Sequence, residues 1–176
     1  MDNSTYQGMS SSKNEHWCTP KEILDLVRQV NPIALDPCSN KHSTVNAKIS
    51  YSLPDDGTLA DWTALCELYG LAFVNHPYKR GITVPNWYRK IVHEAENGCE
   101  IITLSAARTD TAWCQKYVFG KAQAVCFVAG RLRFIDGLTG KKAGAGAFFP
   151  SMLAYYGPNV EKFKTIFNSL GAIRTP

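Results

Sequence analysis

Leu71-Ala72-Phe73-Val74-Asn75-His76-Pro77-Tyr78 changes from apolar to polar within a single step. The first four residues predict a short buried strand. Pro77 ends it, because proline donates no ladder hydrogen bond and restricts the residue before it. A rigid turn then presents an amide, backbone carbonyls and an aromatic ring at the carboxyl end of the strand, where open α/β sheets bind ligands. The alternative is purely structural, with Asn75 as a turn former and Tyr78 as a core residue.

Strands and helices alternate along the rest of the chain. Strands are predicted at residues 32–36, 100–104, 124–128 and 148–156, with a last short one near Ile173, and residues 130–134 continue as an extended segment. Helices are predicted at residues 20–30, 84–97, 110–119 and 160–170, with a short helix or irregular cover at 59–68. This alternation predicts an α/β fold with a mixed, mostly parallel sheet flanked by helices. We expect one domain over residues 15–176 after a flexible N-terminal tail at residues 1–14.

Composition narrows the class of protein. Hydrophobic residues make up 45% and charged residues 19% of the 176, which is typical of a globular chain. No apolar run approaches the roughly 20 residues of a membrane helix, and no signal peptide is recognisable. The six cysteines form no CxxC pair, which argues against a metal site and predicts reduced thiols. A net charge of +4 permits a polyanionic partner.

The chain becomes structured at Trp17-Cys18-Thr19-Pro20. Thr19 is a good helix N-cap, Pro20 a good first helical residue, and Glu22 completes a capping box. Capping explains Thr19 and Pro20 but leaves Trp17 unexplained.

Asp36 ends the predicted strand before the small-residue turn Pro37-Cys38-Ser39-Asn40. An acid at this position can meet a nucleoside or the ammonium of a methionine group, or it can simply cap a loop. The glycine-rich dinucleotide fingerprint is missing here. A long polar connection follows, which is typical of a functional loop.

Residues 137–146 predict a flexible basic loop that contains Lys141 and Lys142. The loop does not have the spacing of a P-loop. Its lysines either contact phosphates or are simply solvated.

Taken together, seven short motifs resemble the phage-type DNA N6-adenine methyltransferase (Dam) family. In order along residues 16–155 they are Trp17-x-Thr19-Pro20, Leu35-Asp36, Asn46-Ala47-Lys48, Gly57-x-Leu59-x-x-Trp62, Asn75-x-Pro77-Tyr78, Arg108-Thr109-Asp110-Thr111-x-Trp113 and Gly130-Arg131-x-x-Phe134. The resemblance implies a Rossmann-like methyltransferase domain that uses S-adenosylmethionine. It also implies a phage or prophage enzyme that acts on DNA in the bacterial cytoplasm. His76 is a departure, because the family has proline at that position.

The resemblance also implies roles for individual residues. The catalytic turn comprises Asn75, His76, Pro77 and Tyr78. The candidate cofactor-binding residues are Trp17, Thr19, Pro20, Asp36, Cys38 and Asn75. The candidate DNA-binding residues are Lys79, Arg80, Arg108, Arg131, Arg133, Lys141 and Lys142.

The chemistry of an adenine amine accounts for the residue types in the catalytic turn. The N6 lone pair is delocalised into the ring, so the amine is a poor nucleophile. Acceptance of both N6 hydrogens by Asn75 and the His76 carbonyl makes the nitrogen nucleophilic and orients it. Tyr78 can stack on a base taken out of the duplex.

Two alternatives remain open at the level of sequence. The chain is either another amino-group methyltransferase, acting on protein glutamine or RNA, or an inactive methyltransferase fold kept as a binding module. For His76 we expect that substitution by proline keeps or raises activity. The competing hypothesis is that His76 has been recruited to contact a phosphate or a modified base.

Overall fold

The computed structural model describes residues 17–77 and 83–176. The predicted tail at residues 1–14 lies outside the described residues. The strands are β1 (Trp17–Cys18), β2 (Ile33–Asp36), β3 (Ile49–Ser50), β4 (Leu71–Val74), β5 (Ile101–Ala106), β6 (Ala124–Val128), β7 (Ile135–Asp136), β8 (Ser151–Tyr156) and β9 (Gly171–Arg174). The helical segments are α2 (Lys21–Val30), η1 (Gly57–Leu59), α3 (Trp62–Tyr69), α4 (Val84–Glu96), η2 (Cys114–Phe119, a π-helix) and α5 (Val160–Phe167).

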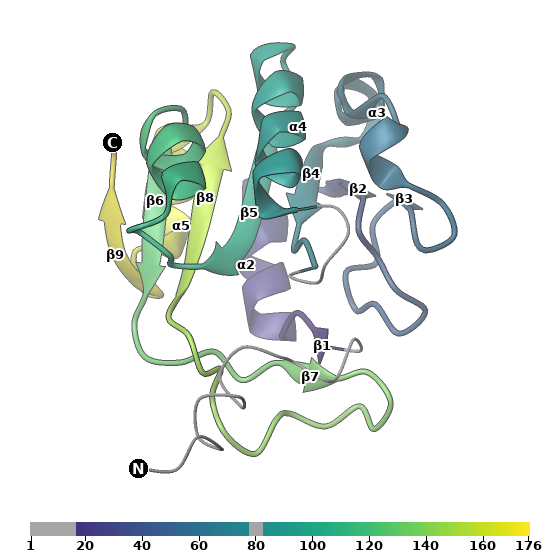
Figure 1. Ribbon diagram of the computed structural model, residues 1–176, viewed down its shortest axis with the longest axis vertical. Coiled ribbons are helices and arrows are strands. Elements are labelled where there is room, and N and C mark those ends of the chain that lie inside the picture. The colour runs from purple at the N-terminus through teal and green to yellow at the C-terminus, as the bar shows by residue number, and fades with distance from the viewer. Residues whose placement is uncertain (1–16, 78–82) are drawn as a thin grey trace.

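Over the described residues, the main sheet has seven strands in the order β3-β2-β4-β5-β8-β6-β9 (Figure 1). Neighbours from β3 to β5 are parallel, whereas β8 is antiparallel to both β5 and β6, and β9 is antiparallel to β6. The prediction of an α/β fold with a mixed sheet flanked by helices is confirmed, but the prediction that the sheet is mostly parallel is wrong, because only three of the six strand pairs in the described residues are parallel. The parallel pairs are confined to the half of the sheet that contains β2 and β4.

Helices cover both faces of the sheet. Side chains of α3, α4 and η2 form one buried cluster on the face that is in front in Figure 1. Side chains of α2 and α5 form a second cluster on the opposite face. The apolar runs of the strands are buried on both sides because each face has its own helical layer.

The strand predicted from residues 71–74 is β4, and its prediction is confirmed. All four of its side chains are fully buried. β4 lies between two parallel neighbours, β2 and β5, in the interior of the sheet. The strand ends at Val74, so Asn75 stands at the carboxyl edge of the sheet.

The predicted capping box at the start of α2 is wrong. The helix begins at Lys21, Pro20 occupies the N-cap position, and no side chain caps the helix. Glu22 instead pairs with Lys142, with Oε1 and Nζ 2.7 Å apart. The Thr19 hydroxyl accepts a hydrogen bond from Asn75, so a tertiary contact replaces the local cap.

The segment predicted as a flexible basic loop lies within a hairpin that is closed by backbone hydrogen bonds. We call residues 131–147 the basic hairpin. Its stem is joined by backbone hydrogen bonds from Ala143 to Phe134 and from Ala147 to Leu132, each of 2.8 Å. Its strand β7 pairs with β1, so that Trp17 lies opposite Asp136. This pairing attaches the hairpin to the segment that leads to Thr19.

Two of the cysteines are joined, contrary to the expectation of reduced thiols. A disulfide links Cys66 in α3 to Cys99, and their Cα atoms are 5.5 Å apart. Both residues are buried, Cys66 under α3 and Cys99 just before β5. The distance between them in sequence hides this proximity, because it arises only when α3 packs on the sheet.

Among the described residues, no helix is long and apolar enough to cross a membrane. The same part of the chain contains no cluster of three or more His, Cys, Asp or Glu side chains placed to hold a metal ion.

Candidate active site

The candidate site begins where two parallel neighbouring strands end. Asp36 is the last residue of β2, and Asn75 directly follows β4. The Cys38 thiol, in the turn after β2, hydrogen-bonds with the backbone of Asn75. Because parallel strands end at the same edge of a sheet, the structure brings these three residues together.

The Asn75 side chain is oriented by Thr19. Its Nδ2 donates a hydrogen bond to Thr19 Oγ1 at 3.2 Å. Thr19 is 2% exposed, and its carbonyl accepts a hydrogen bond from the Thr44 hydroxyl at 2.8 Å. The amide nitrogen is thereby engaged, so Asn75 Oδ1 is left as the acceptor. An asparagine held in this way presents its oxygen to an amine.

Asp36 is a buried carboxylate in a polar turn. Its side chain accepts hydrogen bonds from the Ser43 hydroxyl at 3.1 Å and from the Cys38 backbone N–H at 3.3 Å. Burial raises the pKa of the Asp36 carboxyl, and hydrogen bonds from Ser39 and Ser43 oppose that rise. A carboxylate offers about four acceptor positions. The acceptor capacity that these donors leave on Asp36 therefore fits a ligand that brings a hydroxyl or ammonium group.

The turn after β2 is held in place by η1 and α3. A Cβ on Gly57 would lie 2.0 Å from the Pro37 carbonyl oxygen, so only glycine permits this close approach. The Trp62 indole donates a 2.7 Å hydrogen bond to the Gly57 carbonyl. The motif Gly57-x-Leu59-x-x-Trp62 thus buttresses the Asp36 turn. Sequence reasoning recognised these residues only by resemblance and assigned them no role.

The His76 side chain turns into the protein. It is 1% exposed, and its ring packs edge-on against Tyr88, with centroids 5.6 Å apart and planes at 75°. Burial lowers the pKa of His76 to about 4, so the ring is neutral at pH 7. A neutral, buried ring is poorly suited to the phosphate contact considered in the sequence analysis.

Tyr88 connects the turn at residues 75–77 to the next strand. Its hydroxyl donates a 2.9 Å hydrogen bond to Ser105 near the carboxyl end of β5. Its other neighbour is Trp113, stacked at 4.7 Å between ring centroids. Burial raises the pKa of Tyr88 to about 12, which keeps the hydroxyl protonated as a donor. Sequence reasoning missed Tyr88, because an aromatic residue on the buried face of a helix resembles any other core residue.

The remaining candidate residues of the turn and the cofactor site fall into two groups, those that the structure describes and those that it does not. Tyr78, Lys79 and Arg80 lie outside the described residues. Trp17 is 36% exposed in β1, and Pro20 is buried at the start of α2.

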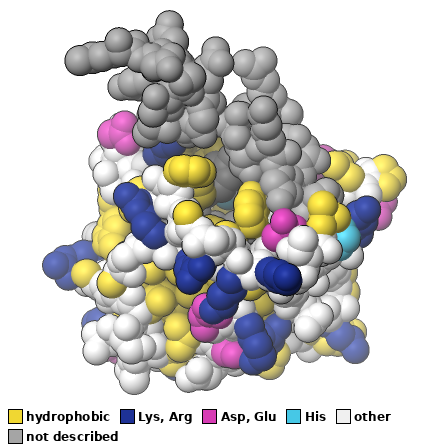
Figure 2. Space-filling model, turned by 90° about the horizontal axis from the view of Figure 1, so that it is seen from below, with side chains coloured by type: hydrophobic (Ala, Val, Ile, Leu, Met, Phe, Trp, Pro, Cys, Tyr) yellow, Lys and Arg dark blue, Asp and Glu magenta, His cyan; other side chains and the backbone are white. Residues whose placement is uncertain are grey.

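The basic candidates occupy two segments at the carboxyl edge of the sheet. Arg108 is exposed in the loop after β5, and the other four belong to the basic hairpin, namely Arg131, Arg133, Lys141 and Lys142. The β1–β7 ribbon lies below the sheet in Figure 1, at the end where β5 terminates. Figure 2 views the molecule from that side and shows several basic side chains interspersed with hydrophobic ones.

Two of the four basic residues in the hairpin are engaged within the protein. The Arg133 guanidinium donates to the carbonyls of Ala143 and Gly144 at 3.0 Å, and Lys142 pairs with Glu22. Arg131 and Lys141 are exposed.

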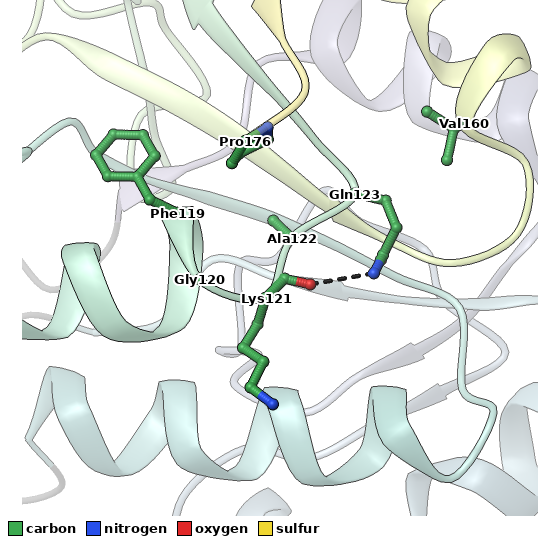
Figure 3. A pocket seen from close by; sticks show the side chains of 7 residues that line it. All are labelled: Phe119, Gly120, Lys121, Ala122, Gln123, Val160 and Pro176. Atoms are coloured by element: carbon green, nitrogen blue, oxygen red, sulfur yellow. Dashed lines mark hydrogen bonds between the residues drawn. The ribbon is translucent and has the colours of Figure 1, made fainter.

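Two concavities lie elsewhere in the molecule. One of about 410 Å³ is lined by Phe119, Gly120, Lys121, Ala122, Gln123, Val160 and Pro176 (Figure 3). It adjoins the start of β6, at the sheet edge opposite Asn75. Its polar groups serve internal contacts, because Gln123 donates to the Lys121 carbonyl and Lys121 pairs with Glu96. A second, of about 650 Å³, lies beside the start of β2 and includes Arg28, Lys48 and Tyr69.

An α/β domain with an amide and a buried carboxylate at adjoining strand ends has the layout of a ligand-binding enzyme. A family model described as DNA N-6-adenine-methyltransferase (Dam) matches residues 7–171. The chain therefore belongs to this family and is an adenine-specific DNA methyltransferase. No curated protein and no solved structure matches it.

Proposed function

We propose that this chain transfers the methyl group of S-adenosylmethionine to the N6 amine of adenine in DNA. It does so as one Rossmann-like methyltransferase domain over residues 15–176. We further propose that it is a phage or prophage modification enzyme that acts in the bacterial cytoplasm. The single observation that carries the proposal is the Asn75 amide, fixed by Thr19 with its oxygen available as an acceptor.

The residues near β2 fit the methyl donor. Asp36 has acceptor positions for a hydroxyl or an ammonium, and both groups occur in S-adenosylmethionine. Thr19 and Cys38 contact Asn75 at these strand ends, Pro20 follows Thr19 in the sequence, and Trp17 lies two residues before Thr19. When bound, S-adenosylmethionine supplies a methyl group activated by a sulfonium.

The catalytic turn prepares the amine. Asn75 Oδ1 and the His76 carbonyl accept the two N6 hydrogens, which concentrates the lone pair on nitrogen and orients it. Tyr78 stacks on the extruded base. The extra proton of the methylated amine leaves to water, so the reaction requires no general base in the protein.

DNA approaches the carboxyl edge of the sheet in this proposal. Arg108, Arg131 and Lys141 are exposed there, and contacts with phosphates hold the duplex without reading its sequence. Two large apolar side chains, Leu138 and Phe148, are also exposed in this part of the chain, at 61% and 79%. They supply surface for contacts with bases or sugars.

The test is methyl transfer from labelled S-adenosylmethionine to DNA, with nucleosides identified by mass spectrometry. Asn75→Ala should lower the rate by roughly 100-fold or more, the cost of deleting one oriented polar group at a reacting centre. Asn168→Ala is the matched control, because Asn168 is an exposed asparagine at the end of α5. It should react at the wild-type rate.

RNA and protein substrates are assayed in parallel. Label found in either of them, with no N6-methyladenine in DNA, would overturn the proposal. So would binding of S-adenosylmethionine without transfer to any substrate, which would identify a binding module. Wild-type turnover by Asn75→Ala would remove the catalytic role from this turn.

A further inference from the structure

The catalytic turn has a histidine where the resemblance predicts proline, so the turn lacks one source of rigidity. Proline fixes its own φ near −65°, whereas histidine leaves φ free. Nevertheless, the His76 ring is nearly completely buried, although it directly follows Asn75 at an edge of the sheet. A polar residue in this position is usually exposed.

The rings of His76, Tyr88 and Trp113 form a continuous series of aromatic contacts. His76 packs edge-on against Tyr88 of α4, and Trp113, at the start of η2, stacks on Tyr88 from another side. The Tyr88 hydroxyl is bonded to Ser105, near the carboxyl end of β5. Tyr88 is fully buried, so the ring that receives His76 is itself immobilised by packing.

We propose that the His76 side chain is a positioning residue, whose buried ring, seated on Tyr88, supplies the rigidity of the turn that holds the Asn75 amide. This inference rests on the proposed function for its consequence, but its geometry stands independently. His76 is joined directly to Asn75 by a peptide bond, and the His76 carbonyl is the second proposed acceptor for the amine. Anchoring the ring therefore restrains both acceptors at once.

Small displacements are costly at a reacting centre. A misplacement of about 1 Å can lower a rate by about 100-fold. The ring is suited to anchoring because it is neutral at pH 7, so its burial carries no charge penalty. The Nδ1 atom of the His76 ring is 3.3 Å from the Pro77 carbonyl oxygen, and this contact further restricts the ring.

The experiment compares three substitutions at position 76 by steady-state methyl transfer. His76→Ala removes the ring and should lower kcat by roughly 10- to 100-fold, with KM for DNA and for S-adenosylmethionine changed by less than about threefold. His76→Phe keeps a planar ring against Tyr88, and His76→Pro restores a fixed φ. Both should therefore retain clearly more kcat than His76→Ala.

A matched control separates positioning from lost stability. Phe163→Leu shrinks a buried aromatic side chain in the cluster on the opposite face of the sheet. At a temperature where all variants are folded, Phe163→Leu should keep the wild-type kcat. Equal kcat for His76→Ala and His76→Phe would overturn the proposal, and so would wild-type kcat in His76→Ala.

A spectroscopic measurement judges the inference even if the proposed function fails. The side-chain amide of Asn75 gives a pair of ¹H–¹⁵N resonances, assigned by their loss in Asn75→Asp. His76→Ala should shift and broaden this pair, whereas His76→Phe and Phe163→Leu should leave it near its wild-type position. A wild-type protein that methylates no DNA refutes the proposed function alone. Resonances that stay unmoved in His76→Ala refute the positioning role alone.

Discussion

In the proposed site, the hydroxyl of Thr19 engages the Asn75 amide nitrogen and leaves the amide oxygen for the substrate. It accepts the hydrogen bond from Nδ2, and the opposite orientation would place two N–H donors against an amine. The orientation of the Asn75 amide therefore depends on one contact between two residues that are 56 positions apart in the sequence.

Thr19→Val tests this contact, because valine has the same shape without the hydroxyl. The lost hydrogen bond is worth about 0.5–1.5 kcal/mol, which corresponds to a fall in the single-turnover rate of roughly 2- to 13-fold. Thr19→Ser keeps the acceptor and should retain most of the rate. A Thr19→Val enzyme as fast as Thr19→Ser would show that another group orients the amide.

The buried imidazole of His76 predicts a specific dependence of stability on pH. Its folded-state pKa, about 4, is below the ordinary value of 6.5, so the unfolded chain binds the proton more readily. The contribution is fully present above about pH 6.5 and is lost as pH falls through about 4. Between these values His76→Phe should lose less stability than the wild type.

Urea unfolding at pH 7 and pH 4.5 measures this difference. Other groups, including Asp36 with its raised pKa, are common to both proteins and cancel in the comparison. Identical pH dependence in the two proteins would mean that the ring is protonated equally in the folded and unfolded states.

At the scale of elements, the lysines of the basic hairpin differ in their contacts within the protein. If both lysines contact phosphates, replacement of Lys141 and Lys142 together is expected from sequence to lower the salt slope of DNA binding by about two units. Lys142, however, already pairs with Glu22.

Lys141→Ala should lower the slope by about one unit, and Lys142→Ala by less, because its phosphate contact competes with an internal carboxylate. Binding titrations over a range of salt concentrations measure both slopes. Glu22→Gln is the companion variant, and it should strengthen binding by releasing Lys142. If the affinity does not vary with salt in any variant, the lysines of the hairpin are solvated and do not contact phosphates.

Elements formed by local patterns could be predicted, and those formed by distant partners could not. The apolar runs identified β4 and β6, and the periodicity of residues 84–97 identified α4 to within one residue. The β1–β7 pair was missed, because two residues of strand carry no periodicity and the partners are more than 100 positions apart. The capping box failed for a related reason, since the Thr19 hydroxyl has a tertiary partner.

The same distinction applies to the site. Asn75 and Asp36 could be found because each stands where a buried strand ends, and strand order alone then brings them together. Tyr88 could not, because its role depends on its contacts with the His76 and Trp113 rings, which come from distant parts of the chain. Nor could the sequence distinguish Lys142, paired with Glu22, from Lys141.

At the scale of the whole molecule, the DNA contacts that we propose for the described residues all lie at one edge of the seven-stranded sheet. Over the described residues the chain forms one seven-stranded sheet with a helical layer on each face and the separate β1–β7 ribbon, and its exposed basic candidates lie at that edge. We therefore expect a short and loosely defined sequence context around the methylated adenine. Mapping N6-methyladenine by sequencing DNA from cells that express the chain measures this context. A long, strictly conserved context would require reading elements beyond those described.

The stem and the tip of the basic hairpin differ in the contacts that hold them. Its stem is held by β1 and by its own backbone bonds, and β1 leads within one residue to Thr19. Its tip, residues 137–140, contacts Asp136 within the hairpin and exposes Leu138. Mutations and insertions at the tip thus leave the stem intact, and with it the threonine that orients the amide. If the tip contacts DNA as we propose, substitutions there can alter the DNA contacts while the position of the Thr19 hydroxyl stays unchanged.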